Sequence, residues 1–278
     1  MSIITAILLG IVQGVAEFFP ISSSGHLSII QNLFKLGGEQ ENLFFNVLLH
    51  LGTLISICVV FRKDLGAMIS DTIELIRKGS DDGEDDRRVK PTVRMVILVI
   101  VGSLPLILAV PFYGFIEKLF SFVGFVGFAL IMNGAILFVA DRFVEKGTKT
   151  SRTMTMKDAL VIGFAQLIAL IPGISRSGTT ISVGMSRGLD RDFAVRFSLI
   201  LSLPAVFGAT LVSLFNAVKQ GIDWSAFPAL LVGFVISAAI GIFVITFLRR
   251  IMAKGKFGNF AYYCWGVGAL AIILSIIL

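Results

Sequence analysis

The stretch that decides the fold is GIVQGVAEFFPISSSGH, residues 10–26. A second stretch, GFAQLIALIPGISRSGT at residues 163–179, repeats its pattern after a shift of 153 residues. The chain therefore contains an internal repeat, which is the first feature to establish in reading a fold. The shared positions are Gly10 with Gly163, Gln13 with Gln166, Ser22 with Ser175, Ser24 with Ser177 and Gly25 with Gly178.

The two copies differ where reactive side chains occur. The first copy contains Glu17, Ser23 and His26. The second copy has Leu170, Arg176 and Thr179 at those positions. The two copies therefore share the glycine, glutamine and serine positions but differ in their reactive side chains.

The composition identifies an integral membrane protein. Of 278 residues, 56% are hydrophobic and only 15% are charged, whereas a soluble domain carries about a quarter charged residues. The mean hydropathy is +0.92. The net charge of +6 is judged by which loops carry it, and it does not indicate nucleic-acid binding. Cys58 and Cys264 lie in apolar runs and are expected to act as small apolar side chains.

Six uninterrupted apolar runs are long enough to span a bilayer as helices, which takes about 20 residues. The two repeated stretches instead combine a short apolar arm, a Pro/Ser/Gly break and a second short arm. We predict re-entrant helical hairpins there, because broken backbone at membrane depth is tolerated only inside protein or beside water. The alternative is that residues 3–21 form an ordinary spanning helix. The six runs cover residues 43–61, 93–112, 119–140, 193–215, 226–248 and 259–278.

The basic residues indicate the orientation. With the 62–94 loop inside, 20 of the 24 Lys and Arg residues fall on that side. Lys35, Lys118 and Lys219 fall outside, and Arg176 lies within the second repeated stretch. Such an asymmetry marks the cytoplasmic face. It does not decide between a hairpin and a spanning helix at residues 3–21, because both give the same sidedness.

We predict one all-α membrane domain over residues 1–278, built from two inverted repeats. Repeat one covers residues 1–140 and begins with a hairpin at 3–34. Repeat two covers residues 157–278 and begins with a hairpin at 158–187. Three spans follow each hairpin, so the two hairpins enter from opposite faces. Inverted repeats bring their broken helices face to face near the midplane, so both stretches are expected to converge on one site.

Three ionisable side chains fall at membrane depth, where charge is costly and indicates function. They are Glu17, His26 and Arg176. Gln13 and Glu17 are four residues apart and share a helix face. A guanidinium with several hydroxyls at a helix start is typical of phosphate binding. The candidate phosphate ligands beside Arg176 are Ser175, Ser177, Gly178, Thr179 and Thr180, and those of the first copy are Ser22, Ser24 and Gly25.

Structural roles compete with these functional ones. Ser24 and Ser177 could satisfy backbone groups freed at a hairpin turn, and Glu17 with Arg176 could form a purely structural ion pair. His50 lies within a span, and we expect a hydrogen-bonded packing residue there rather than a functional one.

Residues near the span ends are expected to face the membrane surface. Asp190 and Arg191 are expected to be surface charges, and residues 64–78 an interfacial helix. Aromatic residues near span ends are typical interfacial anchors; these are Trp224, Tyr262, Tyr263 and Trp265.

These residues alone indicate an anion site between two hairpins. They do not choose between an enzyme that hydrolyses a phosphate compound and a transporter that carries one. The difference between the copies favours the enzyme, because a symmetric carrier would not need it. A purely structural protein would leave three ionisable groups without a purpose.

The motifs together resemble the undecaprenyl-diphosphate phosphatase family, also called bacitracin-resistance proteins. They are Gln13-x-x-x-Glu17, Ser22–His26, Phe45-x-x-x-Leu49-His50-Leu-Gly52-Thr53, Pro172–Thr180 and Phe197–Pro204. The resemblance covers essentially the whole chain. Gln13 stands at a position where the family has Glu or Gln, so this chain has one fewer potential carboxylate.

The resemblance implies dephosphorylation of a polyprenyl diphosphate to the monophosphate lipid carrier used for cell-envelope polysaccharides. It also implies a multi-pass protein of the cytoplasmic (inner) membrane, dependence on Mg²⁺ or Ca²⁺, a site open to the outer face and a possible homodimer. A flippase for polyprenyl phosphate, or a transporter of another anion, is the alternative.

The resemblance also assigns roles to residues. By matching positions, Glu17, Ser23, His26 and Arg176 are the expected catalytic residues. Glu17 and Gln13 are the expected metal ligands, and Glu17 is otherwise expected to orient His26. Ser23, His26 and a metal-activated water stay open as the nucleophile.

Overall fold

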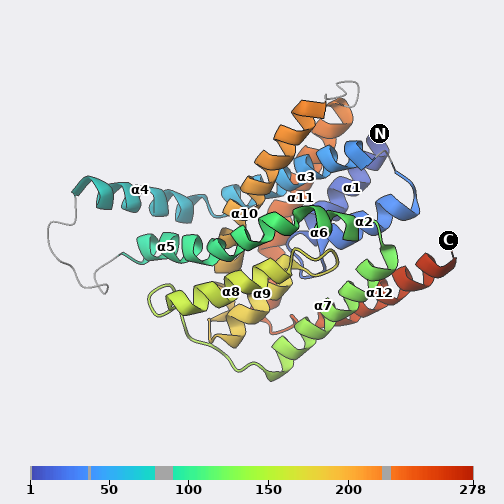
Figure 1. Ribbon diagram of the computed structural model, residues 1–278. Helices are drawn as coiled ribbons and strands as arrows, with labels where there is room; N and C mark the ends of the chain where they lie inside the picture. Colours follow the sequence, from blue (N-terminus) through green and yellow to red (C-terminus); the bar gives the residue numbers. More distant parts are fainter. Residues whose placement is uncertain (1, 37–38, 79–89, 221–226, 278) are drawn as a thin grey trace.

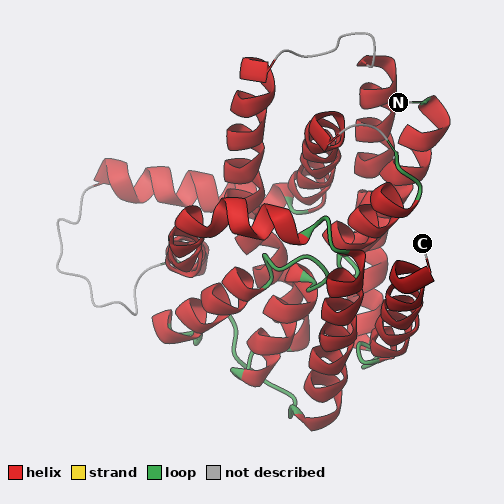
Figure 2. Cartoon of the chain, turned by 45° about the vertical axis from the view of Figure 1, so that its right-hand side comes forward, coloured by secondary structure: helices red, strands yellow, loops and turns green. Residues whose placement is uncertain are grey.

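The computed structural model of the protein describes all residues except 1, 37–38, 79–89, 221–226 and 278. The described residues form helices and loops, with one isolated parallel bridge between Lys149 and Leu189. The predicted all-α class is confirmed (Figure 2). The helices are α1 (Ile3–Ala16), α2 (Ser23–Leu33), α3 (Glu39–Val60), α4 (Arg62–Lys78), α5 (Pro91–Ser103), the 3-10 helix η2 (Leu104–Phe112), α6 (Tyr113–Leu119), α7 (Val123–Phe143), α8 (Met156–Ile168), α9 (Arg176–Ser186), α10 (Arg191–Gln220), α11 (Phe227–Ala253) and α12 (Asn259–Ile277).

Each half of the chain begins with a pair of short helices. α1 and α2 have 14 and 11 residues, and α8 and α9 have 13 and 11. None reaches the roughly 20 residues that a span requires. Because α1 ends at Ala16 and α2 packs back against it, the alternative of a spanning helix over residues 3–21 is wrong. The two helical hairpins are confirmed, whereas their entry from opposite faces of a bilayer stays a prediction.

The predicted spans correspond to long apolar helices. Five are long and apolar enough to cross a membrane, and a sixth, in α3, bends by 77° into α4. The run predicted at 119–140 becomes helical only at Val123, because Ser121 and Phe122 form a turn whose N–H groups bond to the carbonyls of Lys118 and Leu119. The five helices are Pro91–Phe112, Val123–Phe143, Arg191–Val212, Phe227–Ala253 and Asn259–Ile277.

The predicted interfacial segment is helical as α4. Figure 1 shows α4 and α5 projecting side by side from the rest of the protein. Lys90 Nζ lies 2.9 Å from Asp71 and 2.7 Å from Glu74. Hydrogen bonds from Thr92 and then Lys90 hold the pKa of Asp71 below its ordinary value. These polar contacts join the start of α5 to α4, and the position of α4 at a membrane surface stays a prediction.

Close helix packing interlocks the two halves of the chain. α7 packs along α12, and α1 packs along α11 (Figure 1). A Cβ on Gly127 would lie 2.7 Å from the carbonyl oxygen of Gly268, and one on Gly268 would lie 2.6 Å from that of Gly127. The backbones of α7 and α12 therefore touch at these glycines. Because α1 packs along α11, a helix of the second half also holds the first hairpin in place.

A buried carboxylate closes the base of the second hairpin. Asp158, in the first turn of α8, accepts hydrogen bonds from Lys149 Nζ at 2.9 Å and from Arg187 Nε at 2.8 Å. Thr155 completes a capping box with it. Burial raises the pKa of Asp158, but these hydrogen bonds outweigh burial and hold the pKa below its ordinary value. The two ends of the hairpin are therefore tied together.

Candidate active site

The tips of the two hairpins meet, as the repeat predicts. A Cβ on Gly25 would lie 3.0 Å from the Cα of Gly173, and one on Gly178 would lie 3.0 Å from the Cβ of Pro20. Gly173 has φ of +100°, which glycine adopts without the penalty of a side chain. These positions let the two backbones approach closely. Two segments far apart in the chain therefore share one site.

Asn133 joins the two tips. Its Nδ2 donates to the carbonyl of Pro20 at 2.8 Å, and its Oδ1 accepts from the backbone N–H of Ser175 at 2.9 Å. The side chain is fully buried in α7. Two backbone groups, one from each hairpin, are thereby satisfied. Our sequence interpretation missed Asn133, although an amide within an apolar span is a signal that could have identified it.

The repeated serines cap the second helix of each hairpin. Ser22 Oγ accepts from the N–H of Gly25 at 3.2 Å, and Ser175 Oγ accepts from that of Gly178 at 3.1 Å. Their hydroxyls also contact those of the serines two residues on, Ser24 at 3.3 Å and Ser177 at 3.1 Å. The repeated Ile-Ser-x-Ser-Gly pattern is therefore first of all a helix-capping motif.

Glu17 lies at the centre of a polar cluster that also contains Gln13, Ser23, His50 and Arg176. Its side chain is about 6% exposed and its Oε1 lies 2.5 Å from Arg176 Nη2, so the two hairpins are joined by an ion pair. The other oxygen, Oε2, accepts from Ser23 Oγ at 2.6 Å and from Gln13 Nε2 at 3.0 Å. One buried carboxylate thus connects a hydroxyl on α2 to a guanidinium on α9.

His50 also belongs to this cluster, and it is hydrogen-bonded as expected. Its Nδ1 lies 2.8 Å from Gln13 Nε2 and 3.3 Å from Glu17 Oε2. It comes from α3, which contacts α1. An ionisable residue within a span is a recognised signal of function. The sequence did not reveal which polar groups it would face.

His26 is held by different partners. Its Nδ1 lies 2.7 Å from the carbonyl oxygen of Ser22, and its Nε2 lies 2.9 Å from the hydroxyl of Tyr263. The expectation that Glu17 orients His26 is therefore wrong in this structure, because a backbone carbonyl and a tyrosine do so. Ser22 has a positive φ of 68° and lies at the turn before α2.

The hydroxyls near Arg176 point in different directions. Thr180 Oγ1 donates to the carbonyl of Arg176 and lies 2.5 Å from Ser198 Oγ on α10. Thr179 Oγ1 is buried without a hydrogen-bond partner among the described residues. Of the predicted phosphate ligands on α9, the structure therefore places Arg176 in the cluster and turns Thr180 toward α10.

The donors that could hold a metal are few. Among the described residues, no group of three His, Cys, Asp or Glu side chains is close enough to bind one. Glu17 offers a carboxylate, and the buried Gln13 Oε1 has no partner in the described part of the chain. Oxygen donors of this kind suit Mg²⁺ and Ca²⁺. A cation here would need most of its ligands from substrate and water. The two protein donors therefore fit a metal that binds together with a diphosphate.

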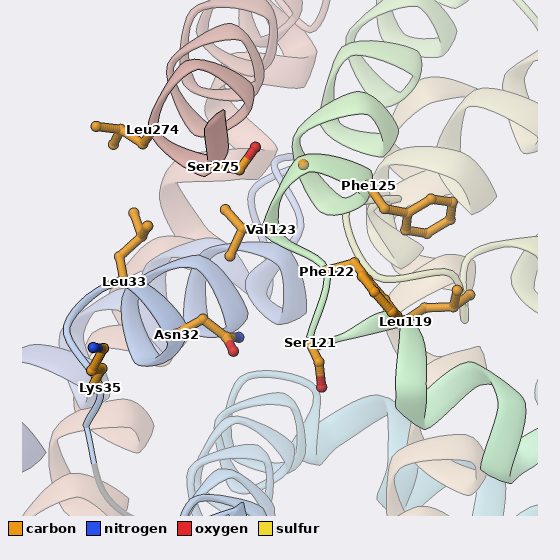
Figure 3. Close-up of a pocket in the computed structure, with 11 residues that line it drawn as sticks. Asn32, Leu33, Lys35, Leu119, Ser121, Phe122, Val123, Phe125, Leu274 and Ser275 are labelled. Carbon is orange, nitrogen blue, oxygen red and sulfur yellow. The ribbon is translucent and has the colours of Figure 1, made fainter. Parts of the chain in front are cut away.

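A separate cavity of about 580 Å³ opens at the far end of α2 (Figure 3). None of the clustered residues described above lines it. The labelled side chains in Figure 3 come from the ends of α2, α6, α7 and α12, and they include Asn32, Lys35, Ser121 and Ser275.

Two predictions about residues near the span ends need correction, those for Asp190 and Arg191, and a third is extended. Tyr263 contacts His26 and is more than an interfacial anchor. Asp190 Oδ1 accepts from the N–H groups of Asp192 and Phe193, and Arg191 Nη1 lies 3.1 Å from Asp141 Oδ1. Both residues are half-buried rather than surface charges, and these contacts help to hold the start of α10. Trp224 lies outside the described residues.

The fold and the cluster define a class: a multi-pass helical membrane protein whose paired hairpins hold a buried carboxylate, a guanidinium, a hydroxyl and an imidazole, with a second imidazole from α3. The family described as Bacitracin resistance protein BacA matches residues 6–270, and the chain belongs to that family. Curated relatives named undecaprenyl-diphosphatase match over nearly their whole length. The protein of Halothermothrix orenii is 39% identical over 276 residues, covering 99% of each chain. That of Methanosphaera stadtmanae is 39% identical over 282 residues, covering 100% of each.

Proposed function

We propose that this membrane protein hydrolyses undecaprenyl diphosphate, or a similar polyprenyl diphosphate, to the monophosphate and inorganic phosphate. The observation that carries the proposal is the array in which Glu17 contacts Ser23 on one side and Arg176 on the other. The family membership and the printed names of the relatives support this substrate class. Recycling of this lipid carrier would serve synthesis of cell-envelope polysaccharides and accounts for the family's link to bacitracin resistance.

Arg176 supplies the charge that binds the terminal phosphoryl group. A guanidinium presents several N–H donors to phosphate oxygens and stabilises the charge of phosphoryl transfer. In the structure it is paired with Glu17. The arriving diphosphate would take over part of that pairing. The cationic group is therefore already held at the point where the anion arrives.

Ser23 is the nucleophile that the geometry favours. A nucleophile and its base are recognised by a hydrogen bond between them, and Ser23 Oγ donates to Glu17 Oε2 at 2.6 Å. The Ser23 oxygen would bond to the terminal phosphorus while its proton passes to Glu17. The bond from that phosphorus to the bridging oxygen breaks, and the lipid monophosphate leaves. Water would then release inorganic phosphate from Ser23, with His26 Nε2 as the base that accepts its proton.

A divalent cation, Mg²⁺ or Ca²⁺, would be held by Glu17 and Gln13 Oε1 together with oxygens of the diphosphate. Such a cation neutralises phosphate charge when bound. We also propose that the protein lies in the cytoplasmic (inner) membrane, that the site faces outward and that the protein can form a homodimer. The distribution of basic residues supports the orientation.

The test is phosphate release by purified protein in detergent, with a polyprenyl diphosphate and either Mg²⁺ or Ca²⁺. We expect release that a chelator abolishes and that Ser23→Ala lowers by about a thousandfold. Ser28→Ala is the matched control, because Ser28 lies on the same helix and donates to Phe120 instead.

Three results would change the proposal. No release from several polyprenyl diphosphates would overturn it. Full activity in Ser23→Ala would move the nucleophile to His26 or to a metal-bound water. Passage of a polyprenyl phosphate across a proteoliposome bilayer without hydrolysis would favour the flippase.

A further inference from the structure

Tyr263 completes the surroundings of His26 from the other half of the chain. Its hydroxyl lies 2.9 Å from His26 Nε2. The two rings are nearly parallel, with an interplanar angle of 11° and centroids 5.6 Å apart. The contact joins α2 of the first half to α12 of the second. It therefore crosses between the repeats, as the ion pair of Glu17 and Arg176 does.

The residues after Tyr263 determine where it points. Cys264 is fully buried, and its Sγ lies 3.4 Å from Asn133 Nδ2 and 3.9 Å from the carbonyl oxygen of Pro20. Trp265 Nε1 donates to the carbonyl of Ile131 at 3.1 Å. The start of α12 is thus tied both to α7 and to the tip of the first hairpin. The adjacent Tyr263 side chain is directed at His26 by this packing.

The two contacts of His26 assign its protons. A carbonyl oxygen can only accept, so the bond to Ser22 requires a proton on Nδ1. In the neutral ring the lone pair then lies on Nε2, and Tyr263 donates to it. When Nε2 takes up a proton, the same tyrosine oxygen can accept from it. One hydroxyl therefore supports both protonation states without turning the ring.

We propose that Tyr263 is a positioning residue: its hydroxyl fixes the orientation of the His26 ring through Nε2, and the reacting water takes its place at that atom when His26 acts as a base. This inference rests on the proposed function for its kinetic consequence, but the hydrogen bond itself can be tested without any turnover. Tyr263 is about half exposed. A hydroxyl that is not buried can bond to water, so the need to satisfy a buried polar group does not account for its bond to His26.

The chain offers a matched control in the neighbouring residue. The Tyr262 ring meets Phe138 edge-on and Trp265 at 89°, so it packs away from His26. Tyr263→Phe and Tyr262→Phe each remove one hydroxyl from adjacent positions and preserve both rings. Only the first of these variants removes the bond to Nε2.

The first measurement is the rate at which diethyl pyrocarbonate modifies each histidine, read by mass spectrometry of peptides. The chain contains only two histidines, so His50 serves as an internal standard for folding. We expect His26 modification to rise about fivefold in Tyr263→Phe, the factor that the loss of one hydrogen bond implies. It should be unchanged in Tyr262→Phe, and His50 should be unchanged in both.

The second measurement is phosphate release by the same variants. We expect kcat of Tyr263→Phe to fall about tenfold with KM within about twofold, because positioning acts on the chemical step. An unchanged His26 modification rate would overturn the proposed hydrogen bond. A raised rate with unchanged kcat would overturn the positioning role. Absence of phosphate release by the unmodified protein would reject the proposed function while leaving the modification result valid.

Discussion

The two hairpins have the same framework but contribute different groups to the site. In both, a serine caps the second helix through the N–H of a glycine three residues on, at Ser22 and at Ser175. The first hairpin then adds Glu17 and Ser23, and the second adds Arg176 at the position that matches Ser23. The comparison teaches that the shared residues build the hairpins, whereas the differing residues carry the chemistry.

The largest expected effect comes from removing the group that only the second hairpin supplies. Arg176→Ala should lower phosphate release by about a thousandfold or more, because the phosphoryl group loses its cation. Arg176→Lys should keep part of the activity, since lysine retains the charge but not the forked donors. Activity of Arg176→Ala within tenfold of the unmodified protein would contradict this role. Elution volume and thermal unfolding in detergent check that the variants are folded.

The next effect tests how the two hairpins are joined. Asn133→Leu leaves the Ser175 N–H without its partner and leaves the Pro20 carbonyl only the weak contact to Cys264 Sγ at 3.9 Å; a buried polar group without a partner costs about 1–3 kcal/mol. We expect a clear drop in the melting temperature and a loss of activity. Gln166→Leu is the control, because both polar atoms of the Gln166 amide are buried without partners among the described residues. Equal melting temperatures for both variants would show that the bridge between the tips adds nothing.

A smaller effect compares two glutamines at matching positions. Gln13 Nε2 contacts Glu17 and His50, whereas both polar atoms of Gln166 are buried without partners among the described residues. Gln13→Leu should therefore destabilise the protein by about 1–3 kcal/mol. Gln166→Leu should be neutral or stabilising, because it removes an unsatisfied polar group. Thermal unfolding of the two variants measures the difference, and a larger loss in Gln166→Leu would refute it.

The smallest effect distinguishes the two capping serines. Replacing a cap by glycine costs only a few tenths of a kcal/mol. At Ser22, with φ of 68°, glycine also relieves about 1 kcal/mol of strain. Ser22→Gly should therefore raise the melting temperature slightly, whereas Ser175→Gly, at φ of −78°, should lower it. If the order were reversed, the backbone of Ser22 would carry no strain.

The framework of the hairpins could be predicted from the sequence for physical reasons. Serine and glycine at fixed spacing mark a helix start, and arms shorter than a bilayer cannot span it. The repeat also predicted that the two hairpins meet at one site, and Glu17 of the first hairpin does pair with Arg176 of the second. Local residue patterns and the repeat were therefore enough to predict both hairpins and the meeting of their tips.

The partners of the two histidines could not be predicted, because they come from contacts between distant helices. His50 reaches Glu17 only because α3 packs near α1, and His26 reaches Tyr263 only because α12 is tied to the first tip through Cys264. Nothing in the spacing of these residues encodes such contacts. Tyr263 shares its span-end position with Tyr262, which packs elsewhere.

The central claim is that Glu17 from one hairpin and Arg176 from the other act as a single unit. A double-mutant cycle on phosphate release tests it most directly, with Glu17→Gln and Arg176→Lys measured singly and together. We predict that kcat of the double variant falls about as far as that of the worse single variant, because groups that act as a unit are lost together. Losses that multiply would contradict the claim and would leave the two hairpins with independent roles.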